Sequence, residues 1–507
     1  MNRRLFLTKI AAAVGALAAT NVLAQRETMG HSSNGHGMDH GQMSGHGMSN
    51  SSASGHMGSS HLLPESALPQ GNTLPALPKL ANVSGTAGTF TGNLTAKPIS
   101  VELAHGLMTE FWAYNGQIPG PAIEVFEGDT VDITFKNELP QPTTLHWHGL
   151  PVPPDQDGNP QDEVMPGATR TYRFTLPEDC AGTYWYHPHG HNTVAEQAFR
   201  GLAGAFIVKP KQDRLSHIPV QDWLLSDLKL DADGKIADNS MMDWMNGREG
   251  QFVLINGALR PQITLNGATR ARIWNACSGR YLNLALNEAN VYVIGTDGGL
   301  IEQPHRVDAL LLSPGERAEV LIVPTKTGQQ SLQSLSYDRG KMGCSGVEGV
   351  RTLATVAMTQ SEMPTLPASL RTLPTLGQPV ATKTLEYTET MDMGMSGMNF
   401  LINGKKHDPS RVDLTSKLGD VEEWEIFNNS HMDHNFHLHG TQFTIVDYRL
   451  NGQVRKPDYV GHKDTVNLKP YERVRIRMAQ HHKGLRMYHC HILEHETLGM
   501  MGQLEVV

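Results

Sequence analysis

The chain has 507 residues, of which 39% are hydrophobic and 18% are charged, and its formal net charge is −9. Its 50 Gly and 29 Pro exceed the usual share of these residues and favour a turn-rich, all-β architecture. A chain of this length is expected to form about three domains, which excludes a small disulfide-stapled scaffold. The acidic balance, with no basic block along the chain, argues against nucleic-acid binding.

The first 24 residues have the layout of a twin-arginine export signal. Arg3 and Arg4 precede an apolar stretch over residues 10–19, and Ala24 ends a small-residue cleavage pattern. The apolar stretch is too short to span a membrane. We therefore expect a bacterial protein that is exported to the periplasm and keeps no membrane anchor.

Residues 25–61 have an unusual composition, with 6 His, 5 Met, 8 Gly and 9 Ser and no aromatic residue. Such a segment cannot bury a core. Imidazole and thioether groups together suit copper in both oxidation states, so copper capture is favoured over a plain flexible linker. Residues 25–78 are predicted to form a disordered His- and Met-rich tail followed by a Pro-rich connector.

Three stretches further along the chain share one pattern of strand, tight turn and strand. They cover residues 123–137, 263–275 and 412–428. Their turn glycines are 139 and 152 residues apart, which is a domain spacing rather than a solenoid spacing. The sequence thus predicts three related β-sandwich domains, which cover residues 79–212, 213–375 and 376–507.

The first and third domains carry matching His-x-His pairs. In both, one pair begins 18 residues after the turn glycine, and a second pair precedes a Gly-x-x-x-Val strand. The pairs are His146 and His148, His187 and His189, His437 and His439, and His489 and His491. The middle domain has only two histidines between residues 215 and 380, so it is predicted to be a metal-free spacer.

In a strand, residues i and i+2 face the same way, so each His-x-His pair presents two imidazoles toward one point. Four pairs in two matching domains can therefore bring eight imidazoles to one domain interface. A fifth pair, His189 and His191, has no counterpart in the third domain. We expect His191 to touch a ligand or to be incidental.

Cys490 adds a second metal site, because in an extended segment it points away from the histidines on either side of it. A thiolate with two imidazoles and a weak axial thioether is the ligand set of a blue electron-transfer copper. Its partners in this set are His434, His495 and Met500. The remaining cysteines, Cys180, Cys277 and Cys344, have no predicted role or redox state.

With these motifs in this order, residues 80–507 resemble the multicopper oxidases. The resemblance implies three consecutive cupredoxin-like Greek-key β-sandwich domains and four copper ions. It assigns a type 1 copper to His434, Cys490, His495 and Met500, and a type 2 copper to His146 and His437. It assigns the type 3 pair to His148, His187 and His491 on one copper and to His189, His439 and His489 on the other.

The resemblance also implies the reaction. A small reductant gives single electrons to the type 1 copper, Cys490 carries them to the trinuclear cluster, and four such events reduce O2 to two waters. Asp157 and Glu496 match positions that supply protons in similar copper-efflux oxidases. Asp157 also lies in a turn-forming segment, so a structural role for it stays open.

Two substrate classes are open: phenols, as in laccase-like members of the family, and Cu(I), as in copper-efflux members. Soft thioether donors suit Cu(I), and the candidate residues are Met391, Asp392, Met393, Met395 and Met432. Similar efflux oxidases carry a much longer Met-rich insert, and a run of Met can also be plain packing. The tail and the export signal favour Cu(I) oxidation in copper detoxification.

A periplasmic copper-storage protein without enzymatic activity is the alternative from a different class. The complete ligand sets argue against storage. We expect a monomeric enzyme whose partners are O2 and a small reductant, either Cu(I) or a phenol.

Overall fold

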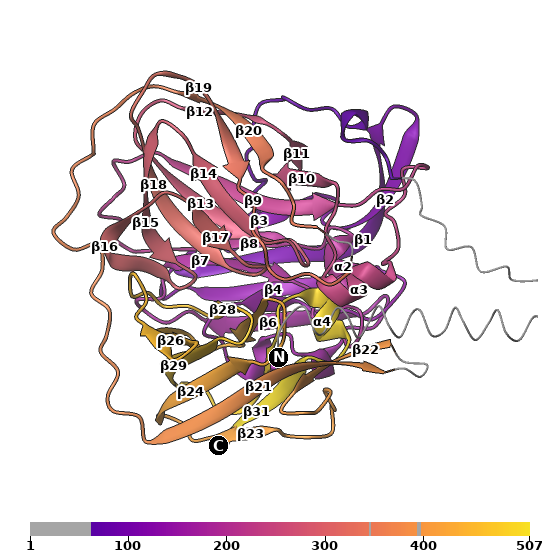
Figure 1. The fold of residues 1–507 in the computed structure, drawn as a ribbon, viewed down its shortest axis with the longest axis vertical. Coiled ribbons are helices and arrows are strands. Elements are labelled where there is room, and N and C mark those ends of the chain that lie inside the picture. Colours follow the sequence, from indigo (N-terminus) through magenta and orange to yellow (C-terminus); the bar gives the residue numbers. More distant parts are fainter. Residues whose placement is uncertain (1–61, 344–345, 393–396) are drawn as a thin grey trace, which may run out of the picture. The chain divides into compact units, whose positions relative to one another are not determined.

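The computed structural model describes residues 62–343, 346–392 and 397–507. The predicted signal and tail therefore lie outside the described residues, as do Cys344, Met393 and Met395. The described part is nearly all β, and it forms three sandwiches that follow one another along the chain (Figure 1). None of its helices is long and apolar enough to cross a membrane.

The first sandwich packs two four-stranded sheets, with strand orders β2-β1-β4-β6 and β3-β8-β7-β5. Its strands are β1 (Thr89–Ala104), β2 (Leu107–Tyr114), β3 (Gly120–Phe126), β4 (Thr130–Asn137), β5 (His146–His148), β6 (Thr169–Thr175), β7 (Gly182–His187) and β8 (Gly204–Lys209). Its helical segments are η2 (Pro154–Gln156), η3 (Pro160–Asp162) and α2 (Val194–Phe199).

The second sandwich has sheet orders β11-β10-β9-β13-β18-β15-β16 and β12-β20-β19-β14-β17. Its strands are β9 (Val220–Leu228), β10 (Phe252–Ile255), β11 (Ala258–Leu259), β12 (Gln262–Leu265), β13 (Thr269–Asn275), β14 (Leu282–Leu286), β15 (Ala289–Thr296), β16 (Gly299–Val307), β17 (Leu310–Leu312), β18 (Arg317–Pro324), β19 (Gly328–Ser334) and β20 (Arg351–Met358). Its helix is α3 (Met241–Asn246).

The third sandwich has sheet orders β22-β21-β24-β29-β26-β27 and β23-β31-β30-β25-β28. Its strands are β21 (Ala381–Asp392), β22 (Gly397–Ile402), β23 (Leu414–Ser416), β24 (Val421–Asn428), β25 (His434–Leu438), β26 (Phe443–Leu450), β27 (Gln453–Arg455), β28 (Thr465–Leu468), β29 (Arg473–Ala479), β30 (Gly484–His489) and β31 (Met501–Val506). Its helix is α4 (Leu493–Thr497).

One strand order recurs in all three sandwiches, which confirms the predicted repetition. The order β2-β1-β4-β6 of the first sandwich returns as β10-β9-β13-β18 in the second and as β22-β21-β24-β29 in the third. The strand that comes first in sequence within each series pairs in parallel with the strand that follows the tight turn. These pairs are β1 with β4, β9 with β13, and β21 with β24. Such non-sequential pairing requires crossovers between the two sheets, and it marks all three domains as one Greek-key type.

Strand burial explains where the histidines lie. Along β24 every second residue is well buried, as expected when one face of a strand covers a core. Every residue of β5 and β25 is buried, because one face packs on the domain's own core and the other faces another domain. Trp147, between the first two histidines, belongs to the first domain's core cluster, so His146 and His148 face outward from it.

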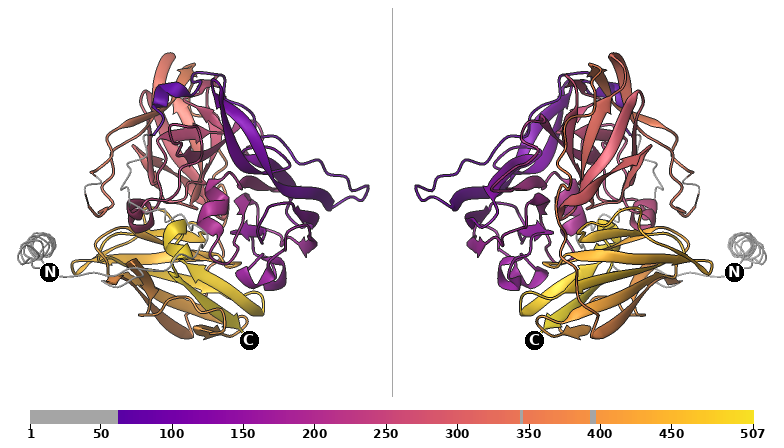
Figure 2. Two further views of the ribbon diagram at one scale, coloured as in Figure 1. Left: turned by 90° about the vertical axis from the view of Figure 1, so that its right-hand side faces the viewer. Right: turned by 90° about the vertical axis from the view of Figure 1, so that its left-hand side faces the viewer.

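The three domains share buried contacts. Apolar residues of β7, β8, β9 and β13 form one cluster between the first and second domains, and the Trp274 indole N–H donates to the Tyr184 carbonyl across it, 2.7 Å away. Helices α2 and α4 meet through Val194, Ala195 and Leu493, which joins the first domain to the third. In Figure 2 the chain colours separate the three sandwiches in sequence order.

The Pro-rich connector is an ordered segment. Its single 3-10 turn, η1 (Glu65–Ala67), is followed by bridges from Gln70 and Thr73 to the edge of the second domain. Glu65 also pairs with Arg260 and Arg351 of that domain. The chain therefore lies along the second domain before it forms the first.

Candidate metal centres

Eight of the predicted ligand histidines meet between the first and third domains, and none is more than 1% exposed. Strand register places them in opposed pairs, with His146 across from His187 and His437 across from His489. Residues directly opposite in an antiparallel ladder share a face. Rings from the two domains stack on each other, for example those of His148 and His437, whose centroids lie 3.8 Å apart.

One group of three rings already has the geometry of a metal site. The Nε2 atoms of His189, His439 and His489 lie 3.1 to 3.2 Å from one another. A metal ion bound by all three would sit between these nitrogens. This is one of the two sets that the resemblance stated above assigns to the type 3 pair.

The other type 3 set is also brought together. His148 Nδ1 lies 3.4 Å from His187 Nε2, and the His491 ring centroid is 4.8 Å from that of His148 and 5.4 Å from that of His187. Among the described residues, neither ring nitrogen of His491 has a hydrogen-bond partner. His148 therefore faces the group through Nδ1, because its Nε2 contacts Asp464 at 3.0 Å.

His146 and His437, the predicted type 2 pair, are prepared in the same way. Each ring approaches a backbone carbonyl through Nδ1: that of Asp157 at 2.8 Å and that of Asp464 at 2.9 Å. Each leaves a buried Nε2 without a partner among the described residues. An Nδ1–H···O=C bond fixes the tautomer and frees the Nε2 lone pair for a metal, so these residues fit a copper ion.

Burial keeps the rings in the ligand state. Desolvation, together with repulsion from neighbouring histidines, lowers the pKa of six of the eight, and that of His437 falls to about 4. The six are His148, His187, His189, His437, His439 and His491. Neutral imidazole is the form that binds metal.

The predicted type 1 ligands form a separate group inside the third domain. Cys490 Sγ lies 3.5 Å from His434 Nδ1 and 4.0 Å from His495 Nδ1. Met500 is fully buried in the same core cluster, and its carbonyl accepts the Cys490 N–H at 3.0 Å. Phe400 stacks on His495 with ring centroids 3.8 Å apart. This apolar shell excludes water, and burial raises the pKa of the Cys490 thiol to about 12.

Both predicted proton donors touch the eight-histidine group. Asp157 Oδ2 lies 2.9 Å from His439 Nδ1, and Glu496 lies 3.3 Å from His189 Nε2 and 3.1 Å from His489 Nδ1. Asp157 ends the short η2 turn and is 1% exposed. Both carboxylates therefore orient ligand rings, and delivery of protons by either one stays a prediction.

A buried ion pair that the sequence did not predict contacts the eight-histidine group through His148. Both Asp464 oxygens accept hydrogen bonds from the Arg317 guanidinium, at 2.7 and 2.5 Å. Asp464 also contacts His148, and the side chains of all three residues are buried. Arg317 belongs to the second domain, and it also donates to the Thr183 carbonyl of the first. The second domain is thus more than a spacer, because it links the other two beside the histidines.

Glycine is required at one point of this contact. A Cβ on Gly149, whose φ is +83°, would lie 2.3 Å from Asp464 Oδ2 and 2.4 Å from Arg317 Nη2. Side chains at either distance would force the ion pair apart. The glycine that ends the first His-Trp-His-Gly motif therefore admits the ion pair next to the ligands.

The substrate candidates are placed differently from one another. Met391 is 54% exposed on β21, the Asp392 side chain lies outside the described residues, and Met432 is fully buried in the third domain's core cluster. Met432 is therefore not in contact with solvent, and its role as a ligand of substrate copper stays a prediction. The sequence pattern could not reveal its burial, which depends on packing between distant strands.

Glu389 and His431 lie beside His434, and neither was among the predicted site residues. Glu389 Oε1 lies 2.8 Å from His434 Nε2, on the side of the ring away from Cys490, and Oε2 lies 3.0 Å from His431 Nδ1. The His431 side chain is 31% exposed, whereas that of Glu389 is 5% exposed. No short motif contains Glu389, which is 45 residues from His434 in sequence, so spacing alone could not indicate it.

The two other described cysteines lie apart from these groups. Cys180 and Cys277 are buried free thiols. The Cys180 Sγ–H donates to the Pro177 carbonyl at 2.9 Å, and burial raises its pKa to about 12. A buried thiol with a raised pKa is chemically inert.

Similarity to known proteins agrees with this geometry. Two family profiles described as multicopper oxidase match residues 95–213 and 374–507. A multicopper oxidase of Staphylococcus aureus is 32% identical over 428 residues, which cover 82% of this chain and 88% of that protein. A laccase of Bacillus subtilis is 27% identical over 470 residues, which cover 78% of this chain and 90% of that protein.

A solved structure is also similar. The multicopper oxidase from Campylobacter jejuni, described as a metallo-oxidase, is 48% identical and superposes with a TM-score of 0.86. The match covers 88% of this chain and 98% of that chain.

Replacing Cys490 by Ser tests the separation of the two metal groups. We expect Cys490→Ser to abolish the blue absorption and turnover while copper stays in the eight-histidine group, because none of those rings is touched. Absorption spectra and copper content per chain measure this. Cys180→Ser, a buried thiol distant from both groups, should keep the blue absorption. Retained turnover in Cys490→Ser would contradict the assignment.

Removing the Arg317 charge tests the buried ion pair. Arg317→Met leaves Asp464 buried without its partner, which typically costs about 3–5 kcal/mol of the free energy of unfolding. Urea unfolding of the copper-free protein measures this loss. The control is Arg306→Met, since Arg306 is 60% exposed in a loose surface pair, and its change should stay within about 0.5 kcal/mol. Equal, small effects in both variants would show that the pair is dispensable.

Proposed function

Since this chain belongs to the multicopper oxidase family, we propose that its reductant is Cu(I) and that it serves copper detoxification. Membership makes it a copper-dependent oxidoreductase that uses O2 as acceptor. The observation that carries the Cu(I) proposal is the contact of the Glu389 carboxylate with both His434 and the partly exposed His431, on the strand that also carries Met391. The similar Campylobacter jejuni protein is itself described as a metallo-oxidase.

The proposal includes four copper ions, held as the sequence analysis assigned them. The type 1 ligands are His434, Cys490, His495 and Met500, and the type 2 ligands are His146 and His437; the type 3 ligands are His148, His187 and His491, and His189, His439 and His489. Bound copper supplies one-electron oxidation at the first site and O2 reduction at the cluster. The unpartnered buried Nε2 atoms described above support these assignments.

The two ring nitrogens of His434 contact different groups. Its Nδ1 faces Cys490 and its Nε2 faces the Glu389 carboxylate. A carboxylate on the outer nitrogen fixes the tautomer of a ligand histidine and its ring orientation. The outer edge of His434 is therefore the side at which a reductant approaches.

The charge at this edge suits a cation. Burial alone would raise the pKa of Glu389, but hydrogen bonds from His431 and His434 lower it, so the carboxylate stays charged. Met391 follows Glu389 by two residues on β21 and so shares its face, and Met398 lies directly opposite Met391 on β22. Carboxylate, imidazole and thioether together favour Cu(I) over a neutral phenol.

Asp157 and Glu496 are proposed to hold protons for the reduction of O2. Each carboxylate contacts ring nitrogens of the eight-histidine group at 2.9 to 3.3 Å. Glu496 is the better placed for exchange with water, because it lines a pocket whose rim is exposed, as described below.

We place this activity in the periplasm, reached by the twin-arginine route, on the strength of the Arg3-Arg4 signal. Residues 25–61 would raise the local copper concentration there without forming a site. Each ligand set is complete within one chain, so the proposed unit is a monomer. Oxidation of phenols is the second candidate, and the similarity to a Bacillus subtilis laccase favours it.

A paired substitution separates the two substrates. In the double variant His431→Gln and Met391→Leu, kcat/KM for Cu(I) should fall about tenfold, because the ion loses an imidazole and a thioether. Phenol turnover should hold, since a phenol needs neither group. Steady-state O2 uptake on each substrate measures both.

The matched control is Met108→Leu, because Met108 is also 54% exposed but lies on β2 of the first domain. It should leave both rates unchanged. Equal losses on both substrates in the double variant would indicate packing damage at His434. An unchanged Cu(I) rate would make a phenol the preferred reductant.

A further inference from the structure

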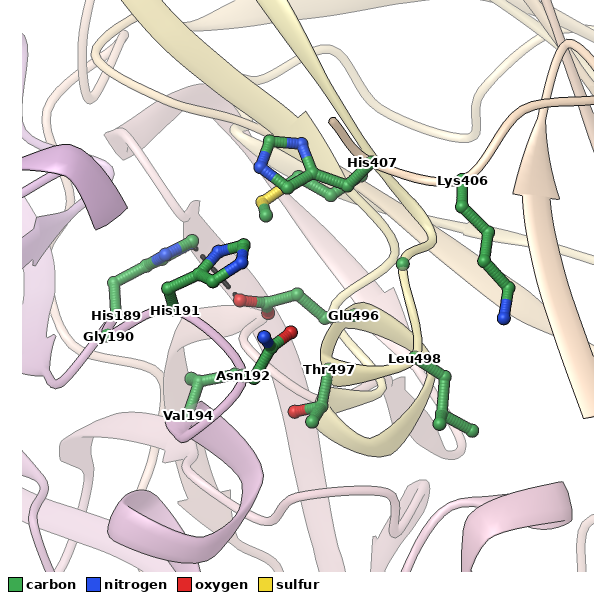
Figure 3. Close-up of a pocket in the computed structure, with 12 residues that line it drawn as sticks. His189, Gly190, His191, Asn192, Val194, Lys406, His407, Glu496, Thr497 and Leu498 are labelled. Atoms are coloured by element: carbon green, nitrogen blue, oxygen red, sulfur yellow. Dashed lines mark ion pairs between the residues drawn. The ribbon is translucent and has the colours of Figure 1, made fainter. Parts of the chain in front are cut away.

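A cavity of about 340 Å³ lies between the loop after β7, the loop after β22, and the end of α4 with the residues that follow it. Its rim includes Asn192 and Lys406, which are exposed, and its inner wall includes His189 and Glu496, which are buried. Figure 3 shows the Glu496 carboxylate directed at His189, which belongs to the eight-histidine group. The cavity therefore connects the surface of the protein with that group.

Two histidines that are not assigned to either metal group face each other across this cavity. The His191 and His407 rings have centroids 5.7 Å apart, and both side chains are half-buried. Within the described residues, the buried Nδ1 of His407 has no hydrogen-bond partner. Met501, which is 6% exposed, also lines the cavity and adds a thioether.

The backbone holds both histidines in place. The His191 N–H donates to Glu163 Oε1 at 3.0 Å, and the His407 N–H donates to the Gly499 carbonyl at 2.9 Å. Burial and the neighbouring His191 lower the pKa of His407 to about 4, so its ring is a neutral ligand at neutral pH.

The negative charge at the inner wall of the cavity favours movement of a cation from the surface toward the eight-histidine group. Glu496 at the inner wall contacts His189 at 3.3 Å and His489 at 3.1 Å. Lys406 lines the rim, but its ammonium group points away from the two rings (Figure 3). A cation would thus pass from imidazole and thioether at the outside to a carboxylate beside the ligand rings.

The buried histidines need such a route. All eight are at most 1% exposed, so in the folded chain a copper ion cannot reach them directly from water. We propose that this cavity is the port through which Cu(I) enters the eight-histidine group during copper uptake, with His191, His407 and Met501 as transient ligands. The proposal concerns loading rather than turnover, so it depends on family membership and not on the choice of Cu(I) as reductant.

Copper uptake by the copper-free full-length chain tests the port. The chain is mixed with Cu(I) without O2 and freed of excess copper at set times. Each sample is then exposed to O2, which oxidises the bound copper to Cu(II), and is assayed for copper content, blue absorption and the type 2 EPR signal. In His191→Gln with His407→Gln, the eight-histidine group should fill about tenfold more slowly. Filling of the Cys490 site and the final copper content should match the unsubstituted chain.

His105→Gln is the control, because His105 is an exposed histidine on the turn after β1, and it should load at the normal rate. Unchanged filling in the double variant would overturn the proposal. Equal slowing at both metal groups would overturn it too, since general damage to the fold affects both. Loss of Cu(I) oxidase activity alone has no bearing on this measurement.

Binding of Ag(I), which mimics Cu(I) without redox chemistry, gives an independent readout. The copper-loaded protein should bind one more equivalent of Ag(I) than the double variant in calorimetric titration. If the double variant does not fold, crystals of the unsubstituted protein soaked in Ag(I) decide. An anomalous peak between His191 and His407 is expected, and an empty cavity would contradict the port.

Discussion

Eight histidine rings meet between two domains with at most 1% exposure, so no bulk water solvates a charge on any of them. Desolvation and mutual repulsion lower the pKa of six of the rings and keep those six neutral. Several ring nitrogens of the group are buried without partners among the described residues. Such orphaned acceptors cost free energy in the absence of a metal. Binding copper removes that cost, and the same burial that creates the site also isolates it from the surface. This isolation is why a loading route is needed at all.

Opposite faces of single strands separate the two metal groups. On β25, His434 points into the third domain, while His437 points to the interface, and Cys490 and His489 divide in the same way at the end of β30. One short segment therefore touches both groups. The second domain contributes no ligand among those assigned, yet its Arg317 compensates the buried Asp464 beside His148. Arg317 of the second domain thus contacts both of the domains that supply the ligands.

The ligand residues could be predicted because their signal is local. A His-x-His pair fixes the direction of two side chains within three residues, and the duplication showed which pairs belong together. The repeated strand-turn-strand pattern likewise predicted three sandwiches. Glu389, Asp464 and Arg317 could not be found in this way, since each acts on a histidine far away in sequence and none lies in a motif. The burial of Met432 has the same origin, because its environment is built by strands that spacing does not relate.

Substitution of His437 tests most directly whether the two faces of β25 serve different metal groups. In His437→Ala, copper analysis and EPR spectroscopy should show loss of the type 2 signal, while the blue absorption of the Cys490 site stays largely intact, because His434 on the other face is unchanged. O2 reduction should stop. Loss of the blue absorption in this variant, with the type 2 signal retained, would contradict the account.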